Sequence, residues 1–185
     1  MTALLHTFVG GDIGVWRVER MQSITGSTLS WVPRLSILEN NQTTLSKGSV
    51  WLLRGVTSYE RYVHKMERST LLSQQAELGR LEATRAALIP IKKSTAWWEL
   101  AQDERRAIFE ERSHHIGIGL KYVTRIARRL YHCYDLGEPF DFLTWFEYAS
   151  TDAEAFEELV GKLRETEEWT YVEREVDIRL AREGT

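Results

Sequence analysis

The sequence is poor in the features that mark disulfide-rich, membrane and nucleic-acid-binding proteins. Its single cysteine, Cys133, excludes an internal disulfide and a multi-cysteine zinc or iron–sulfur site. No apolar run approaches the roughly 20 residues that span a bilayer, and the first residues lack the basic region of a secretory signal. The formal net charge is −3 with both signs interspersed, so we expect neither nucleic acid nor a membrane surface as a partner. These absences favour a cytoplasmic protein.

Familiar catalytic motifs are also absent. The patterns HExxH, GxSxG, GxxxxGK[ST] and GxGxxG do not occur. Cys133 follows His132, but neighbours in a strand point to opposite faces, so we interpret Cys133 as a core residue rather than a nucleophile. A metal would therefore need histidine or carboxylate ligands, or would arrive within an organic cofactor. Seven Trp and seven Tyr are many for 185 residues, and such rings line planar ligands, although core filling is the simpler interpretation of any one ring.

Apolar periodicity predicts a β-rich first third followed by a helix. Alternating residues over 14–24 and a second run over 51–63 indicate strands, with an exposed loop over 39–49 between them. Apolar positions over 64–78 indicate a helix that stops at Gly79. The early region is therefore predicted to be mainly strand.

The second half has a clearer order. It predicts a strand over 83–91, a helix over 95–115, strands over 123–133 and 140–148, a helix over 151–165 and a strand over 171–180. This β-α-β-β-α-β order is the ferredoxin-like pattern of an α+β fold. Its two helices cover one face of an antiparallel sheet, so the other face needs a cover from residues 1–80 or from another subunit.

His115 is the first candidate site residue. At about 100° per residue along the predicted helix, it returns to the direction of Trp97 and lies near Ala101 and Ile108, whereas His114 points elsewhere. His115 therefore lies on the buried stripe. A core imidazole bonded to a backbone carbonyl is the simpler interpretation, and a ligand role needs a second signal.

Arg128 and Glu168 are the further candidates. Arg128 shares strand parity with the apolar Ile126 and Leu130, so it is either half of an internal ion pair or an anion-binding group. Glu168 shares parity with Val172 and the apolar positions after it, which predicts an inward carboxylate, and a surface glutamate is the alternative. A carboxylate beside a histidine fixes the imidazole tautomer and makes it a more basic metal ligand.

Four blocks of sequence occur in a specific order: a Trp pair at 97–98, a His pair at 114–115, RRLYHC at 128–133 and FLTWFEY at 142–148. In this order they resemble the short-chain clade of the chlorite dismutase family, and the likeness extends from about Trp51 to Leu180. The resemblance implies two ferredoxin-like halves, a truncated one over residues 1–80 and a haem-binding one over 81–185. It also implies haem b as cofactor, chlorite or another small anion as substrate, chloride and dioxygen as products, and a homodimer.

The resemblance assigns roles to residues of this sequence. The proximal iron ligand falls on His115, its carboxylate partner on Glu168 and the distal arginine on Arg128, which would retain hypochlorite for O–O bond formation. Family spacing favours Gln75 over Gln74 as the distal glutamine. Contacts with the haem rim and propionates are implied for five more residues: Arg61, Tyr62, Val63, Lys93 and Trp97. Without the resemblance, Lys93 could equally be an exposed lysine.

Two other functions stay open at this point. A coproheme decarboxylase-like enzyme of haem biosynthesis oxidises propionates through a tyrosine, whereas the distal-type Arg128 favours chlorite as the substrate. A non-catalytic haem-binding protein of the dimeric α/β-barrel type is the second. Oxygen release, coproheme affinity and a haem spectrum without activity separate the three.

Overall fold

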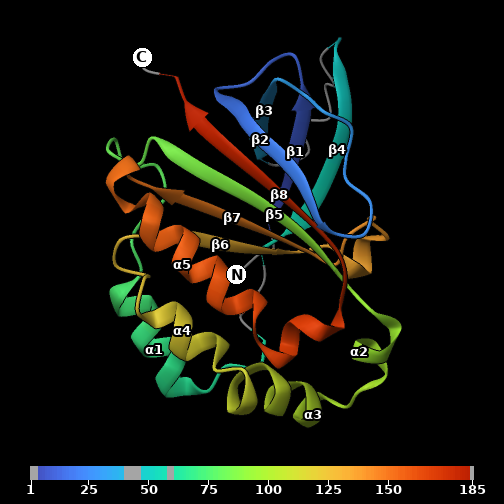
Figure 1. Ribbon diagram of the computed structural model, residues 1–185, viewed down its shortest axis with the longest axis vertical. Helices are drawn as coiled ribbons and strands as arrows, with labels where there is room; N and C mark the ends of the chain where they lie inside the picture. The colour runs from blue at the N-terminus through green and yellow to red at the C-terminus, as the bar shows by residue number, and fades with distance from the viewer. Residues whose placement is uncertain (1–3, 40–46, 58–60, 184–185) are drawn as a thin grey trace.

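The computed structural model describes residues 4–39, 47–57 and 61–183, which form a closed antiparallel β-barrel with helices on one side (Figure 1). Around the barrel the strands follow the order β1-β3-β2-β8-β5-β7-β6-β4. The strands are β1 (Leu5–Gly11), β2 (Trp16–Thr25), β3 (Arg34–Glu39), β4 (Ser49–Val56), β5 (Arg85–Lys93), β6 (Ala127–His132), β7 (Phe142–Tyr148) and β8 (Val172–Arg182). The helices are α1 (Lys65–Gln74), α2 (Thr95–Glu99), α3 (Gln102–Arg106), α4 (His115–Leu120) and α5 (Ala153–Arg164), with short segments η1 (Ala107–Arg112), η2 (Tyr134–Leu136), η3 (Ser150–Asp152) and η4 (Glu167–Tyr171). The predicted α+β class is confirmed.

The two parts of the barrel have the same strand order. In the C-terminal part the strands lie in the order β8-β5-β7-β6, with helices between β5 and β6 and between β7 and β8. In the N-terminal part they lie in the order β4-β1-β3-β2, and the described residues between those strands contain no helix. In both parts, therefore, the fourth strand along the chain lies beside the first, and the first lies beside the third.

Two seams of unequal extent join these parts. Strand β2 pairs with β8 along most of its length, whereas the pairing of β4 with β6 runs through Val56 and His132. Strand β8, red in Figure 1, lies between β2 of the N-terminal part and β5 of the C-terminal part, and so joins the two parts.

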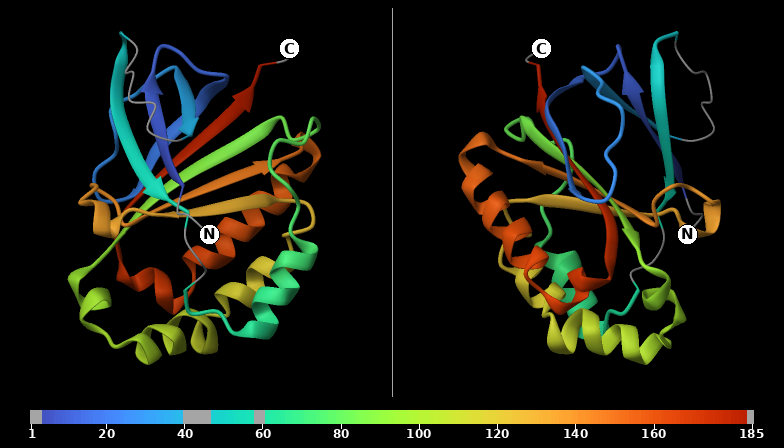
Figure 2. Two further views of the ribbon diagram at one scale, coloured as in Figure 1. Left: turned by 180° about the vertical axis from the view of Figure 1, so that it is seen from behind. Right: turned by 45° about the vertical axis from the view of Figure 1, so that its right-hand side comes forward.

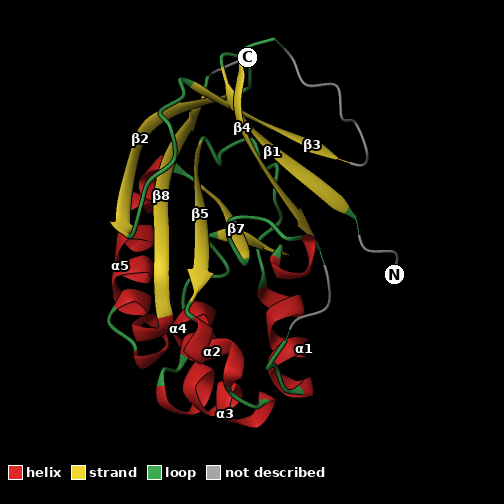
Figure 3. Cartoon of the chain, turned by 90° about the vertical axis from the view of Figure 1, so that its right-hand side faces the viewer, coloured by secondary structure: helices red, strands yellow, loops and turns green. Residues whose placement is uncertain are grey.

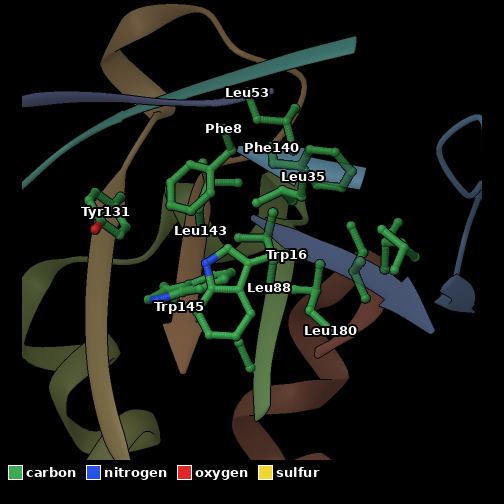
Figure 4. Close-up of a cluster of buried hydrophobic side chains, with 14 of the residues drawn as sticks. Phe8, Trp16, Leu35, Leu53, Leu88, Tyr131, Phe140, Leu143, Trp145 and Leu180 are labelled. Atoms are coloured by element: carbon green, nitrogen blue, oxygen red, sulfur yellow. The ribbon is translucent and has the colours of Figure 1, made fainter. Parts of the chain in front are cut away.

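Large apolar side chains fill the interior of the barrel (Figure 4). The rings of Trp16 and Trp145 meet edge to face with centroids 5.2 Å apart, and Phe8 packs against Trp145 at 5.9 Å. Burying a side chain of this kind contributes about 1.5–3 kcal/mol. Strand β5 faces this core on one side and the helices on the other, which is why its sequence is almost continuously apolar.

The helices cover the outer face of the sheet formed by β8, β5, β7 and β6 (Figures 2 and 3). The helix predicted over 151–165 is confirmed as α5. Its apolar stripe is buried and packs on Phe146 and Tyr148 of β7; the stripe residues are Phe156, Leu159, Val160 and Leu163. In the described part of the chain, no helix is long and apolar enough to cross a membrane.

The single helix predicted over 95–115 is wrong. Leu100 and Ala101 have extended backbone, so α2 ends and a new helix, α3, begins after Ala101, whose N–H donates to the Glu104 carboxylate at 2.7 Å. The chain then continues as the π-helical segment η1. His114 is left-handed, with φ 54°, and His115 is the first residue of α4. His115 therefore does not share a continuous helix with Trp97, so the common helix face predicted for the two residues is wrong.

Other boundaries differ for local reasons. The helix predicted over 64–78 ends at Gln74, because Gln75 is extended and the next N–H donates to the carbonyl of Val123 at 2.7 Å. Glu168 lies in the 3₁₀ segment η4 and not in the last strand, so its predicted strand parity is wrong. Most of the loop predicted over 39–49, and part of the strand predicted over 51–63, lie outside the described residues.

Candidate functional site

A cavity of about 970 Å³ separates the sheet from the helices. Its floor is made by alternate residues of three adjacent strands, which point to the same face because side chains alternate along a strand. We call this set the cavity floor: Ile89, Ile91 and Lys93 of β5, Arg128, Leu130 and His132 of β6, and Phe142, Thr144 and Phe146 of β7. The roof comes from α1, α4 and α5. The volume of the cavity lies at the upper end of the range for cofactor-sized pockets, roughly 300–1,000 Å³.

His115 enters the cavity from the roof. The carboxylate of Glu110 accepts hydrogen bonds from the N–H groups of Ile116 and Gly117, at 2.5 and 3.1 Å, and this fixes the start of α4. The imidazole is stacked near-parallel to Phe109, at a centroid distance of 4.3 Å, and to Trp169 at 6.2 Å. Its ring plane is therefore held before any ligand arrives.

Glu168 holds the Nδ1 side of the His115 ring. Its Oε2 lies 2.6 Å from His115 Nδ1, and its Oε1 accepts a hydrogen bond from Lys93 Nζ at 2.8 Å. The carboxylate is buried, which raises its pKa, but its interactions with His115 and Lys93 outweigh burial and lower the pKa to about 2. An ionised carboxylate at this distance makes Nδ1 the N–H donor, so Nε2 keeps the lone pair that can bind a metal.

Lys93 is buried, and its ammonium is directed at Glu168. Besides that ion pair, it lies over the rings of Trp97, at 4.5 Å from the centroid, and Trp169, at 5.5 Å. An ammonium so placed is a partner of the proximal carboxylate and not an exposed lysine, which resolves the alternative left open by the sequence.

Arg128 and Gln75 belong to the side of the cavity formed by the sheet. Arg128 lies on β6 opposite Phe146 of β7 and shares the cavity floor with Leu130, as the strand parity predicted. Gln75 follows the end of α1, and its Nε2 donates to the backbone carbonyl of Arg128 at 2.5 Å. The segment after Gln75 is fixed by Glu147, whose carboxylate accepts hydrogen bonds from the Gly79 N–H at 2.6 Å and from Trp145 Nε1 at 2.9 Å.

Arg61, Tyr62 and Val63 line the cavity on the way into α1. Tyr62 has a left-handed backbone, with φ 62°, and two arginines fix it: Arg105 donates to its hydroxyl at 3.1 Å, and Arg106 donates to its carbonyl. All nine site residues predicted from the sequence therefore line one cavity. Their roles toward a cofactor stay predictions.

Four residues that shape this site were not among those predicted from the sequence. Phe109 and Trp169 flank His115, Glu147 anchors the segment of Gln75, and His132 lines the cavity. Phe109 lies in a π-helical turn and Trp169 in a 3₁₀ turn, so neither follows the helix or strand periods on which a sequence argument depends. His132 shares the parity of Arg128, and that signal was present.

Fold and site together define a class of protein: an α+β barrel whose cavity, between sheet and helices, presents a carboxylate-backed histidine. Residues 34–183 match the family model described as Chlorite dismutase, and the chain belongs to the chlorite dismutase family. The structure resembles that of the dimeric chlorite dismutases from Nitrobacter winogradskyi, with a TM-score of 0.90, 60% sequence identity, and coverage of 96% of this chain and 99% of that one.

More distant relatives share part of the sequence or the fold. A curated chlorite dismutase from Ideonella dechloratans is 32% identical over 123 residues, and the match spans 64% of this chain but 40% of the relative. A mutant chlorite dismutase from Candidatus Nitrospira defluvii has a TM-score of 0.71 at 20% identity, covering 98% of this chain and 93% of that one, which shows the shared fold.

The chlorite dismutase family is haem-dependent, and the residues present fit a haem. The cavity floor and roof are mostly apolar, as the tetrapyrrole ring requires, and His115 Nε2 is the atom that suits the iron. Trp97 is 1% exposed, and its Nε1 has no hydrogen-bond partner among the described residues. A buried donor without a partner costs free energy, and an acceptor carried by a ligand, such as a propionate, removes that cost.

Proposed function

We propose that this chain is a haem b-dependent chlorite dismutase that converts chlorite to chloride and dioxygen. One observation carries the proposal: the roof presents His115 backed by Glu168, and the sheet presents Arg128 held by Gln75, to the same cavity. The 60% identity to the Nitrobacter winogradskyi chlorite dismutases, over nearly the whole chain, supports the same activity. Chlorite, or another small anion, is the substrate in this proposal.

When bound, the haem would supply a redox-active iron that takes an oxygen atom from chlorite and returns it to form dioxygen. On the proximal side, His115 Nε2 would be the iron ligand. Glu168 keeps the Nδ1 proton in place, and Lys93 balances the charge of the buried carboxylate. This chain of contacts keeps the imidazole electron-rich and prevents its rotation.

On the distal side, Arg128 would bind the anions of the reaction. A guanidinium stays protonated in proteins, so its role is electrostatic and positional and not acid–base. A charge-assisted hydrogen bond would hold chlorite, and then hypochlorite, until the O–O bond forms. Gln75 supports this role because it fixes the backbone of Arg128.

The cavity rim would position the haem. Trp97 offers an unpaired N–H and Arg61 a cation to the propionates, while Tyr62 and Val63 present their segment to the haem edge. The propionate contact that the family resemblance implies for Lys93 is less well supported, because Glu168 already holds its ammonium.

The matching strand order of the two parts supports a further element of the proposal. We infer that residues 1–80 and residues 81–185 are two ferredoxin-like halves, of which the first is truncated. The halves cover the inner faces of each other's sheets, which meets the need for a cover that the sequence indicated. The dimeric state of the Nitrobacter winogradskyi proteins supports a homodimer here, and light scattering tests it.

Absorption spectroscopy and oxygen detection test the function together. The purified protein, reconstituted with haem b, should show a five-coordinate ferric spectrum and release one dioxygen per chlorite at an oxygen electrode. His115→Ala is the matched variant and should lose that spectrum. A haem spectrum without oxygen release would indicate the binding protein, and preferential uptake and decarboxylation of coproheme would indicate the biosynthetic enzyme. Failure of the wild-type protein to bind haem would overturn the proposal.

A further inference from the structure

His132 is a buried, unpaired side chain in the cavity that the proposed reaction does not use. It is 7% exposed, belongs to the cavity floor, and its Nδ1 has no hydrogen-bond partner among the described residues. Leaving a buried polar atom unpaired costs about 1–3 kcal/mol. The imidazole of His132 therefore points to a partner that the chain itself does not supply.

The position of His132 separates it from the distal arginine. It lies four residues after Arg128 on the same face of β6, which is about 13 Å at the rise of a strand. Phe142 of β7 and Ile91 of β5 occupy the same row of the cavity floor, and the His132 ring meets Phe142 edge to face at 5.6 Å. This row lies near the C-terminal end of β5, after which the chain continues to Trp97 in α2. Among the described residues that line the cavity, Trp97 is the other one with an unpaired ring nitrogen.

The polar groups at this end of the cavity are donors. Burial, and then the charge of Arg61, lower the pKa of His132 to about 4, so the ring is neutral near pH 7 and carries one N–H. Trp97 adds an indole N–H. Arg61 adds a guanidinium, which also lies 3.7 Å from the carboxylate of Asp135, an exposed residue outside the cavity lining. Glu168 also lines the cavity, but His115 and Lys93 hold its oxygens. A lining of donors selects an acceptor, and a carboxylate accepts more hydrogen bonds than any other common organic group.

We propose that His132 donates a hydrogen bond to a carboxylate substituent of the tetrapyrrole and, with Trp97 and Arg61, forms a propionate subsite. This inference rests on the proposed function and deepens it, because it fixes the rotation of the ring within the cavity. The propionates would then be directed at the row of His132, and the apolar residues of α5 that line the cavity, Leu159, Val160 and Leu163, would contact parts of the ring without charged substituents.

The rate of haem release tests this contact without reference to turnover. His132→Phe keeps an aromatic ring against Phe142 but removes the N–H, whereas His132→Gln keeps a donor. Transfer of haem b to excess apomyoglobin should be roughly tenfold faster from His132→Phe, the effect of one charge-assisted hydrogen bond, and close to wild type from His132→Gln. Haem dimethyl ester, which lacks the carboxylates, should be released equally fast from wild type and His132→Phe.

Two results would overturn the inference. One is a wild-type release rate for His132→Phe with haem b; the other is an equal acceleration with the dimethyl ester, which would mean that the ring only packs against the ligand. Because these measurements need a protein that binds haem, failure of binding in the wild type would reject the proposed function instead. Should His132→Phe not fold, ¹⁵N-histidine NMR of the wild type decides: zinc protoporphyrin should slow exchange of the His132 ring proton, and its dimethyl ester should not.

Discussion

Gln75 donates a hydrogen bond from its side-chain amide to the backbone carbonyl of Arg128, at 2.5 Å, across a sequence separation of 53 residues. Within the described ranges, β6 pairs with β4 through His132 alone, so the opposite end of its outer edge needs other partners. The amide of Gln75 supplies one of them. A side chain that follows α1 thus completes the edge of the strand that carries the distal arginine.

Gln75→Leu keeps the side-chain size and removes this donor. We expect unchanged haem content, because Gln75 does not touch the proximal side, but fewer turnovers before the haem bleaches, because Arg128 is held less firmly. The exposed neighbour Gln74 provides the matched control, Gln74→Leu. Oxygen yield per enzyme, measured with excess chlorite, checks the prediction, and equal yields for both variants would contradict it.

Arg128→Ala removes the charge proposed to retain the anions. The haem should still bind, since His115 and the rim are unchanged, but hypochlorite should escape and bleach the haem faster. A hypochlorite trap present during turnover should therefore capture more oxidant from the variant than from wild type. Arg128→Lys keeps a cation and should lie between the two. Wild-type activity and haem lifetime in Arg128→Ala would rule out the distal role.

Lys93→Met should destabilise the apoprotein by about 3 kcal/mol or more, because it leaves the buried carboxylate of Glu168 without its lysine partner. Lys92→Met is the control: Lys92 pairs with Glu173 at the surface, where such a pair contributes about 1 kcal/mol or less. Urea unfolding of the two variants measures the difference. Similar losses would mean that the Lys93 ion pair contributes little.

Glu147→Gln tests the anchor of the segment that carries Gln75. The carboxylate accepts from both Gly79 and Trp145, whereas a glutamine has a single acceptor oxygen, so one donor loses its partner. We expect a loss of about 1–3 kcal/mol in unfolding free energy and faster hydrogen exchange at the Gly79 amide. The exposed Glu82 gives the control, Glu82→Gln, and protection of Gly79 equal to wild type would count against the anchor.

The stability of the apoprotein should depend on pH through His132. The pKa of this ring is about 4 in the folded state and about 6.5 when unfolded, so between these values the unfolded chain binds the proton more strongly. Stability should therefore fall as the pH drops from about 6.5 to about 4, by up to roughly 3 kcal/mol from this group. Subtracting the pH profile of His132→Phe isolates the effect, and parallel profiles would disprove it.

The strands of the second half were predictable from the sequence, and the broken helix was not. Alternation has a period of two residues, and it correctly placed Arg128 with Leu130 on the cavity side of β6. A continuous helix was predicted over 95–115 because the composition of this segment favours helix throughout. The break at Leu100 and Ala101 carries no glycine or proline, and Glu104 caps the new helix from within.

His115 and Glu168 were predicted as partners, but the secondary structure assumed for each of them is wrong. His115 does not lie on a continuous helix from Thr95, and Glu168 does not lie in a strand. The two meet because Ser113 Oγ accepts the Glu168 N–H at 2.9 Å and thereby joins η4 to the start of α4. Only the resemblance to a family predicted this tertiary contact, because the helix and strand periods of the sequence contain no information about it.

The place of β8 in the barrel has a consequence for how the protein matures. This strand follows every other described strand along the chain, yet it lies between β2 and β5 and pairs with both. During synthesis, the other described strands are therefore made before the strand that joins the two parts. The long seam between β2 and β5 cannot form until Val172–Arg182 has been synthesised, so the N-terminal part of the barrel waits for a strand of the C-terminal part.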